Sequence, residues 1–346
     1  MSSDRARSPA LTSFVVASRY MPVYVALLLL LIVASIWAPA TLSGVAVRGI
    51  APYGAVLGLA ALGQMLVIMT GGIDLSVPGT MSLAAVIMVG VGDGSNENIW
   101  IAIATAIAVA ALIGLVNGLL IGGLRLNALI TTLAVGLIVA GVVNRYASTF
   151  PVQSRVPPGL SDWISTRIFG VSPVFWIGAG VTTVLIVGLR YTAVGRRFQA
   201  VGANPVASHV VGVRVNLNQI LVYVVAAVFY AIAGVALAGL LRNPGVGAGT
   251  TYLLGPIAAV VIGGASLTGG LASPLSTFVA ALFLTGLNQM LRVMGLPTSL
   301  QFVVFGLVII GGMLVSGDRI IRGVEQLLRE RRPPGDPHTQ TVPGPM

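Results

Sequence analysis

Long stretches of this sequence contain no Asp, Glu, Lys or Arg. Nine of them hold between 18 and 49 residues each. A helix needs about 20 mostly apolar residues to cross the hydrocarbon core of a bilayer, and the longest stretch has room for two such helices. The sequence therefore predicts an all-α polytopic membrane protein with about ten transmembrane helices. The stretches are residues 20–47, 49–73, 75–92, 98–124, 126–144, 168–189, 215–241, 243–291 and 293–317.

Composition excludes several classes of protein. The mean hydropathy is +0.97 and only 8% of the residues are charged, against about 25% in soluble domains. The absence of Lys excludes a Walker A nucleotide site and a Schiff-base enzyme. The absence of Cys and the presence of only two His exclude thiol catalysis and His-rich metal sites. We therefore expect no enzyme activity, cofactor, metal or ATPase site in this chain.

The distribution of Arg predicts the orientation of the chain. With the N-terminus inside, 13 Arg residues fall in cytoplasmic segments and 6 on the other side, so both termini are expected in the cytoplasm. The Arg residues are spread between apolar stretches, so the net charge of +10 does not indicate nucleic-acid binding. A signal peptide cleaved near Ala38-Pro39-Ala40 is disfavoured, because the apolar run before it, residues 21–37, is long for such a leader.

The ends of the chain differ from the membrane domain, which is expected over residues 19–317. Residues 1–18 and 333–346 are polar and are expected to be disordered at the N-terminus and in the tail. Residues 318–332 place apolar side chains at helical spacing opposite Arg and Glu. This segment is either an amphipathic juxtamembrane helix on the lipid headgroups or a solvated extension of the last span.

The segment Gly71-Gly72-Ile73-Asp74-Leu75-Ser76 interrupts the apolar sequence and contains the only carboxylate between Asp4 and Asp93. Two Gly residues are expected to end one helix, and Asp74 and Ser76 are able to cap the next. A capping role is one interpretation, and gating or contact with a substrate is the other. The candidate gate or helix-break residues are Gly71, Gly72, Asp74 and Ser76, with Gly263, Gly264 and Ser266 in a similar segment.

Two internal echoes suggest a duplicated chain with two related half-bundles. The segment 71–76 matches 263–268 at an offset of 192, and Asn117 and Gly136, 19 apart, match Asn288 and Gly306, 18 apart. Gly-interrupted segments at matching positions mark the substrate pathway in duplicated transporters. An inverted repeat would place the two Gly-Gly turns on opposite sides, whereas the Arg count places both inside. The sequence leaves this point open.

A long loop, residues 190–217, falls on the inner side. Asn204 as N-cap, Pro205 in the first turn and Gly212 after the last turn delimit a helix of about seven residues. This helix is either a docking element or an ordinary surface connection.

The spans contain neutral amides and almost no charge. Amides suit the path of an uncharged, hydroxylated solute, and they equally suit hydrogen bonds between helices. Coupling to protons or sodium would require buried carboxylates. No pathway residue can be assigned from sequence. The amides are Gln64, Asn117, Asn127, Asn144, Asn218, Gln219, Asn288, Gln289 and Gln301.

Three motifs, in this order, resemble the ribose-type permeases of bacterial ABC importers, which carry monosaccharides and related small solutes. They are residues 70–77 (TGGIDLSV), residues 195–213 with Gly202-Ala203-Asn204, and residues 254–270, and the resemblance covers most of 45–315. One departure is Pro78, which stands before Gly79 where the family usually has Gly directly after Val.

The resemblance implies a permease of the bacterial plasma (inner) membrane that imports a small neutral solute, such as ribose, by alternating access. It implies a coupling helix over 202–213 that sits in a groove of a cytoplasmic ABC ATPase subunit, which alone uses ATP. It also implies a second permease copy, identical or paralogous, and a periplasmic or lipid-anchored solute-binding protein. The residues assigned to ATPase coupling are Gly202, Asn204, Pro205, Ala207 and Gly212.

Three alternatives differ in class. A sibling permease for branched-chain amino acids or nucleosides shares the same plan of spans. An ion-coupled secondary transporter is disfavoured by the lack of buried carboxylates, and an intramembrane enzyme by the lack of a nucleophile with a base or a metal.

Overall fold

The computed structural model describes residues 9–149 and 155–316, and this part of the chain is built from helices without any strand. Short 3₁₀ or π-helical turns (η) join some of the helices. The helices are α1 (Pro9–Trp37), α2 (Gly44–Met69), α3 (Val77–Gly90), α4 (Ile99–Gly118), α5 (Ala128–Ala147), α6 (Pro158–Ser165), α7 (Pro173–Tyr191), α8 (Ala193–Ala203), α9 (Pro205–Val210), α10 (Val215–Leu241), α11 (Gly255–Ile262), α12 (Pro274–Val293) and α13 (Thr298–Ser316).

Within residues 9–149 and 155–316, seven helices are long and apolar enough to cross a membrane. They are α1, α2, α4, α5, α7, α10 and α12. Three shorter apolar helices accompany them: α3, α11 with the preceding turn η4 (Thr250–Tyr252), and α13. The prediction of an all-α polytopic membrane protein is confirmed, and these apolar helices correspond to the spans expected from the uncharged stretches.

The structure describes the predicted terminal segments only in part. Helix α1 begins at Pro9, so the expectation of disorder over 1–18 is corrected for residues 9–18, which extend the first helix. Residues 1–8, the juxtamembrane segment 318–332 and the tail 333–346 lie outside the described part of the chain.

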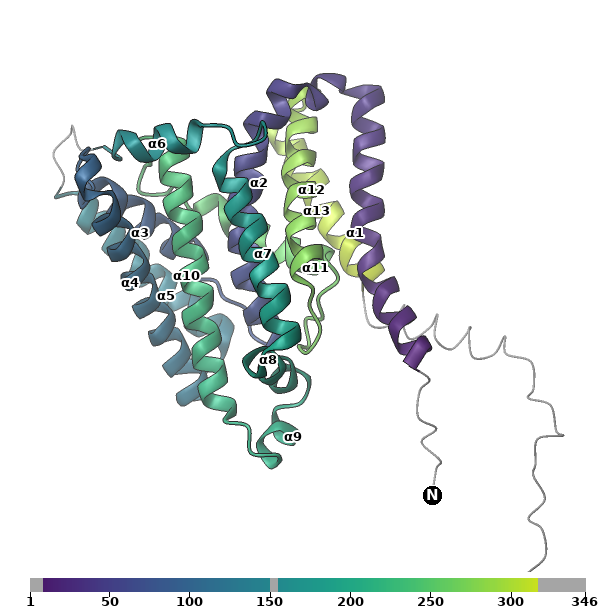
Figure 1. Cartoon of the computed structure of the whole chain (residues 1–346). Helices are drawn as coiled ribbons and strands as arrows, with labels where there is room; N and C mark the ends of the chain where they lie inside the picture. The colour runs from purple at the N-terminus through teal and green to yellow at the C-terminus, as the bar shows by residue number, and fades with distance from the viewer. Residues whose placement is uncertain (1–8, 150–154, 317–346) are drawn as a thin grey trace, which may run out of the picture.

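The bundle has two ends, which we name after the helices found there (Figure 1). Helix α6 and the start of α2 lie at the α6 end, whereas α8 and α9 lie at the α9 end. Arg19 near the start of α1 also reaches the α9 end, because its Nε donates a hydrogen bond to the Gly264 carbonyl at 2.6 Å.

Helices α2 and α10 form the centre of the bundle. Every residue of α2 from Gly54 to Met69 is buried. Gly63 of α2 lies against the Tyr230 ring of α10, and Gly118 of α4 lies against the α10 backbone at Ile220. Because these residues lack side chains, the helices approach closely and gain the van der Waals contact that holds helices together in lipid.

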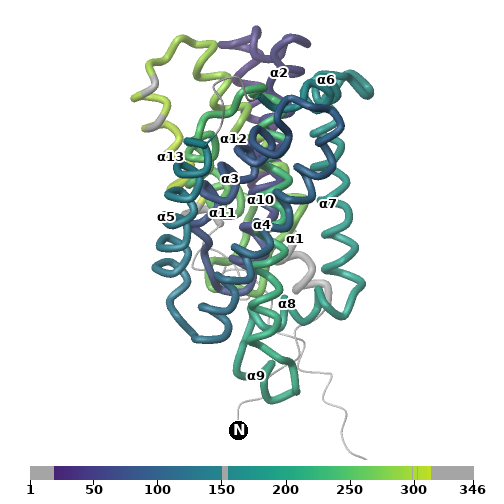
Figure 2. The backbone as a smooth tube through the Cα atoms, turned by 90° about the vertical axis from the view of Figure 1, so that its left-hand side faces the viewer, coloured from purple at the N-terminus to yellow at the C-terminus, as the bar shows by residue number. Residues whose placement is uncertain are grey.

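The two halves of the bundle contain the same order of elements. Helices α2, α3, α4 and α5 correspond to α10, η4 with α11, α12 and α13. Helix α2 begins at Gly44 and α10 begins at Val215, 171 residues later, and α5 and α13 begin 170 residues apart. The directions are opposite, since α2 runs toward the α9 end and α10 runs away from it. The halves therefore form an inverted repeat, and Figure 2 shows its last helices, α5 and α13, along the same side.

The halves meet where the second interrupted segment contacts the start of α3. The chain is not helical over residues 70–76, after α2, or over residues 242–249, after α10. The Gly249 N–H donates to Ser82 Oγ at 3.0 Å, and a Cβ at Gly249 would overlap the carbonyl oxygen of Pro78. Positions 78 and 249 are themselves 171 residues apart. The end of the second interrupted segment thus touches the start of α3, at the position of the first half that is equivalent to Gly249.

The two sequence echoes have different outcomes. The echo of Asn117 and Gly136 follows the repeat, because it pairs α4 with α12 and α5 with α13. The echo at offset 192 pairs the ends of α2 and α11, which both lie at the α9 end, where the Gly270 N–H donates to the Met69 carbonyl at 2.8 Å. Its interpretation as a repeat is therefore corrected, and both Gly-Gly turns lie at one end.

The contact at the centre of the repeat predicts a stability effect. Gly249→Ala would push the second interrupted segment away from Pro78, and we expect a loss of about 1–3 kcal/mol, seen as a lower melting temperature in detergent. Gly245→Ala in the same segment is the control, because nothing lies within 4 Å of its Cβ position. Equal melting temperatures for the two variants would contradict the close contact.

Candidate functional site

The Gly71-Gly72 pair ends α2 in a Schellman motif. Gly71 has a φ of 86°, the Gly71 N–H donates to Ile68 O at 2.9 Å, and the Gly72 N–H donates to Val67 O at 3.0 Å. A left-handed residue at this position costs little only when it is Gly, which explains why the helix ends here. The predicted helix break is present.

The same motif ends α11, one residue out of the predicted register. Gly264 has a φ of 84°, its N–H donates to Val261 O at 2.9 Å, and the Ala265 N–H donates to Val260 O at 3.1 Å. Gly71 is thus equivalent to Gly264 rather than to Gly263. After the turn the segments differ. In this register Leu267, rather than Ser266, is equivalent to Asp74. The Ser266 Oγ instead pairs with Thr268 Oγ1 at 2.8 Å.

The segment after Gly72 is not helical, and its two polar residues are buried. Asp74 and Ser76 are each 1% exposed. Asp74 Oδ1 accepts hydrogen bonds from the Ser76 N–H at 2.8 Å and from Ser76 Oγ at 2.6 Å. Asp74 therefore orders the turn before α3. The sequence had also indicated Ser76 as a capping residue, but its side chain makes no capping hydrogen bond to that helix.

Distant helices hold this segment in place. The Gln64 amide of α2, in the orientation that pairs both of its polar atoms, donates to Asp74 O and accepts from the Asp74 N–H, both at 3.1 Å. Thr132 Oγ1 of α5 accepts from the Leu75 N–H at 2.9 Å, and Asn117 Nδ2 of α4 donates to Ser76 Oγ at 3.0 Å. Sequence reasoning missed Gln64 and Thr132 as partners, because neither lies near Asp74 in the chain.

Three buried polar atoms around the segment have no hydrogen-bond partner among the described residues. They are Asp74 Oδ2, Asn117 Oδ1 and Tyr223 Oη. Tyr223 of α10 lies directly against Gly72, because a Cβ there would be 2.5 Å from Tyr223 Oη. Unpaired polar groups cost free energy when they are buried. The hydrogen bonds of the segment stabilise it, and these three unpaired atoms offset part of that stabilisation.

Helix α9 has the predicted ends. Asn204 Oδ1 accepts from the Ala207 N–H at 2.9 Å, Pro205 opens the helix, and Gly212 has a φ of 83° after its last turn. Its six residues, Pro205–Val210, are close to the expected seven. The exposed tip of the loop is apolar, since Val206, Val210 and Val211 are 75%, 80% and 76% exposed.

Gly202 does not belong to this exposed tip. It is buried in α8, a helix that the sequence reasoning missed although Thr192 caps it and Phe198 and Val201 form an apolar face. A Cβ at Gly202 would overlap the carbonyl oxygen of Met69 and lie 2.8 Å from the Gly270 nitrogen. The expectation that Gly202 contacts a partner is corrected: it joins α8 to the end of α2 and to the segment after α11.

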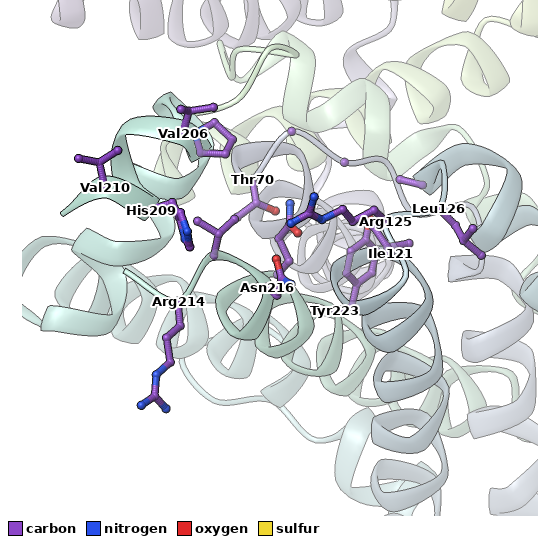
Figure 3. Close-up of a pocket in the computed structure, with 16 residues that line it drawn as sticks. Thr70, Ile121, Arg125, Leu126, Val206, His209, Val210, Arg214, Asn216 and Tyr223 are labelled. Carbon is purple, nitrogen blue, oxygen red and sulfur yellow. The ribbon is translucent and has the colours of Figure 1, made fainter. Parts of the chain in front are cut away.

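A cavity of about 740 Å³ connects the helix break to α9, and we call it the α9 cavity. Its walls come from the break, the end of α4 with its π-helical turn η3 (Leu119–Gly123), α9 and the start of α10. Figure 3 shows Thr70, Arg125 and Asn216 gathered at its centre and the Arg214 side chain pointing away. The lining residues are Thr70, Gly71, Gly72, Ile121, Arg125, Leu126, Ala128, Pro205, Val206, His209, Val210, Arg214, Val215, Asn216, Gln219 and Tyr223.

The candidate residues thus form two connected groups. Gly71, Gly72, Asp74 and Ser76 lie at the break, and Asn204, Pro205, Ala207 and Gly212 shape α9 across the α9 cavity. Gly263, Gly264 and Ser266 reach the same region through Gly270 and Gly202. Helix α8 therefore directly contacts the end of α2 and the segment that follows α11.

The Gly202 contact predicts a local change in dynamics. Gly202→Ala would separate α8 from Met69, so the amides of α8 and α9 are expected to exchange with deuterium faster than in the unchanged protein. Gly188→Ala in α7 is the matched control, because its Cβ position is open. Unchanged exchange in both variants would show that the contact between Gly202 and Met69 does not hold α8 in place.

The buried carboxylate predicts an asymmetry between two substitutions. Asp74→Asn keeps the acceptor that binds Ser76 and removes an incompletely paired buried charge, so the melting temperature is expected to rise or stay equal. Asp74→Ala removes both and is expected to lower stability by about 1–3 kcal/mol. If both variants were equally destabilised, the charge itself would be required for folding.

Comparison with known proteins adds to this geometry. The sequence model of the family described as "Branched-chain amino acid transport system / permease component" matches residues 46–313. The chain is 33% identical to the ribose import permease protein RbsC of Escherichia coli K12, over 75% of this chain and 81% of that protein. No solved structure matches the chain.

The names of two further relatives mention other solutes. The autoinducer 2 import system permease protein LsrC of Klebsiella pneumoniae is 34% identical, over 83% of this chain and 84% of that protein. The galactose/methyl galactoside import permease protein MglC of Escherichia coli K12 is 30% identical, over 83% and 91%.

Proposed function

Because the chain belongs to the permease family described as branched-chain amino acid transport system / permease component, we propose that it is the membrane subunit of an ATP-driven importer. Its solute is a small neutral molecule, a monosaccharide such as ribose, and its location is the plasma (inner) membrane of a bacterium. The names of the relatives support this solute class, since they include ribose and galactose import permeases.

The proposed assembly contains three partners. A cytoplasmic ABC ATPase subunit binds the α9 end and uses the ATP. A periplasmic or lipid-anchored solute-binding protein docks at the α6 end. A second permease copy, identical or closely related, completes the pathway within the lipid. This arrangement places both termini of the chain in the cytoplasm.

The observation that carries the proposal is that the α8–α9 element has an exposed apolar tip on one side and a buried contact with the transmembrane helices on the other. Its tip exposes Val206, Val210 and Val211, whereas its other side contacts the Met69 carbonyl and Gly270 through Gly202. Exposed apolar side chains beyond the membrane region fit a groove in a soluble subunit. Closure of the ATPase subunits would move the tip, and the buried joint would pass this movement to the helix breaks.

The family description and the alternative interpretation both mention branched-chain amino acids. Recognition of an amino acid requires a partner for its ammonium group, usually a carboxylate or a set of carbonyl oxygens. Among the described residues, no Asp or Glu lines the α9 cavity. This favours a neutral solute.

Transport itself provides the test of the function. The permease is reconstituted in vesicles with its ATPase subunit and binding protein, and uptake of labelled D-ribose and D-galactose is followed. Uptake is expected only with ATP inside the compartment that holds the ATPase. Uptake by the chain alone, driven by an ion gradient, would contradict the proposal.

The α9 tip predicts a loss of assembly. Val206→Asp combined with Val210→Asp places charge in the apolar contact, and we expect the amount of co-purified ATPase to fall about tenfold or more. Val246→Asp, an exposed site in the segment after α10, is the control for insertion and folding. Normal co-purification with the doubly substituted tip would refute the coupling role of α9.

A further inference from the structure

A second cavity, of about 870 Å³, lies among α2, α10, η4, α12 and α13, and we call it the α12 cavity. Four polar residues of α12 line it: Thr285, Asn288, Gln289 and Arg292. Their spacing of three and four residues places them on one face of the helix. A polar face on a membrane helix turns toward the protein interior or a water-filled cavity, because lipid cannot solvate it.

The hydrogen bonds of the amides separate two roles that the sequence left open. Six of the nine amides pair within the described protein: Gln64, Asn117, Asn127, Asn144, Asn218 and Gln301. The described residues offer no partner to Gln219, Asn288 or Gln289. These three side chains line the α9 cavity or the α12 cavity. Of the six, only Gln64 and Asn117 bind a distant segment, and the other four bind nearby backbone groups. The amides that pair within the protein and the unpaired amides that line the cavities are therefore different sets.

The chemistry of the α12 cavity suits a neutral polyol. The amides of Asn288 and Gln289 supply donors and acceptors, and Arg292 supplies donors only. Tyr53 and Tyr252 add aromatic surface, and the wall contains no carboxylate. A volume of about 870 Å³ is within the usual range for small-molecule sites and exceeds the volume of one monosaccharide.

The α12 cavity and the α9 cavity occupy matching positions of the inverted repeat. Ile121, at the end of α4, lines one, and Arg292, 171 residues later at the end of α12, lines the other. Val45 and Asn216, at the starts of α2 and α10, are related in the same way. Inverted repeats of this kind produce one opening at each side of the membrane.

A single face of α10 connects the two cavities. Gln219 and Tyr223 line the α9 cavity, and Leu237 and Leu241 line the α12 cavity. Between them Tyr230 is fully buried, and its hydroxyl pairs with the Gln64 amide at 3.1 Å. This face of α10 therefore lines a cavity at each of its ends, and the buried Tyr230 separates the two cavities.

We propose that the α12 cavity is the outward docking site of the transported polyol, with Asn288, Gln289 and Arg292 as its hydrogen-bonding groups. The α9 cavity is its inward counterpart. This inference rests on the proposed transport function and adds the residues of the path, which sequence analysis could not assign.

The absence of Cys makes the test direct, because a single introduced thiol has no background. Asn288→Cys and Gln289→Cys are expressed with the full transport complex in spheroplasts, and a membrane-impermeant methanethiosulfonate reagent is added outside. Val293→Cys is the matched control, since Val293 is exposed at the same end of α12 and does not line the cavity. We expect both cavity thiols to react about tenfold or more faster than the control, because the reagent attacks the thiolate and a thiol in a water-filled cavity ionises more readily than one in apolar surroundings.

Protection identifies the ligand class. D-Ribose or D-galactose in excess is expected to slow labelling at position 288, whereas leucine at the same concentration is not. In uptake assays, Asn288→Ala with Gln289→Ala is expected to raise the solute concentration for half-maximal rate about tenfold, since two hydrogen bonds are lost. Asn144→Ala, in α5 and away from the cavity, is the control.

The outcomes separate this inference from the function on which it rests. ATP-dependent sugar uptake together with unreactive thiols at 288 and 289 would overturn the docking site and leave the function standing. Fast labelling with protection by leucine alone would overturn the polyol assignment. Absence of ATP-dependent uptake in the unchanged complex would overturn the proposed function, and sugar protection of the thiols would still support the site.

Discussion

The structure depends on how two interrupted backbone segments are paired inside a bundle that is surrounded by lipid. In a bilayer each exposed N–H and C=O group must find a partner within the protein, so non-helical backbone is tolerated only where other helices supply one. Residues 73–76 meet this condition through Gln64, Thr132 and the Asp74 side chain. The second segment meets α3 at Gly249 through Ser82. These pairings fix the start of both short helices and the relation between the two halves of the chain.

At the α9 end, the helix breaks bring the end of α2, helix α8 and the segment after α11 into contact. The chain leaves α2 at Met69, and the carbonyl of this residue accepts from Gly270 while α8 packs on it at Gly202. Three backbones are in contact at one point because two Gly residues lack side chains there. Close-packed contacts of this kind are not continuously deformable, which is the physical basis for the proposed coupling between α8 and the ends of α2 and α11. Asp74 orders the neighbouring turn without lying on this line of contact.

The sequence predicted those features that depend on local chemistry. Uncharged stretches predicted the apolar helices, and Gly71 and Gly212 marked helix ends because only Gly adopts their conformation cheaply. Features that depend on distant partners were not predictable. The role of Gln64 arises from a segment ten residues away, and the contact of Gly202 with Met69 joins residues 133 positions apart. The repeat was misjudged at offset 192 because two helices ended by the same Gly motif look alike in sequence whatever their direction.

The two cavities offer similar groups to a neutral solute. Among the described residues, each wall holds two amides, Asn216 and Gln219 in the α9 cavity and Asn288 and Gln289 in the α12 cavity, and each also holds Arg, Arg125 in the first and Arg292 in the second. Amides supply both donors and acceptors, so a polyol that leaves one cavity finds the same chemistry in the other. Between the cavities the Tyr230–Gln64 pair also holds the Asp74 backbone, so opening the middle of α10 requires the first interrupted segment to move. Gln64 therefore contacts both Tyr230, which separates the two cavities along α10, and the backbone of the first helix break.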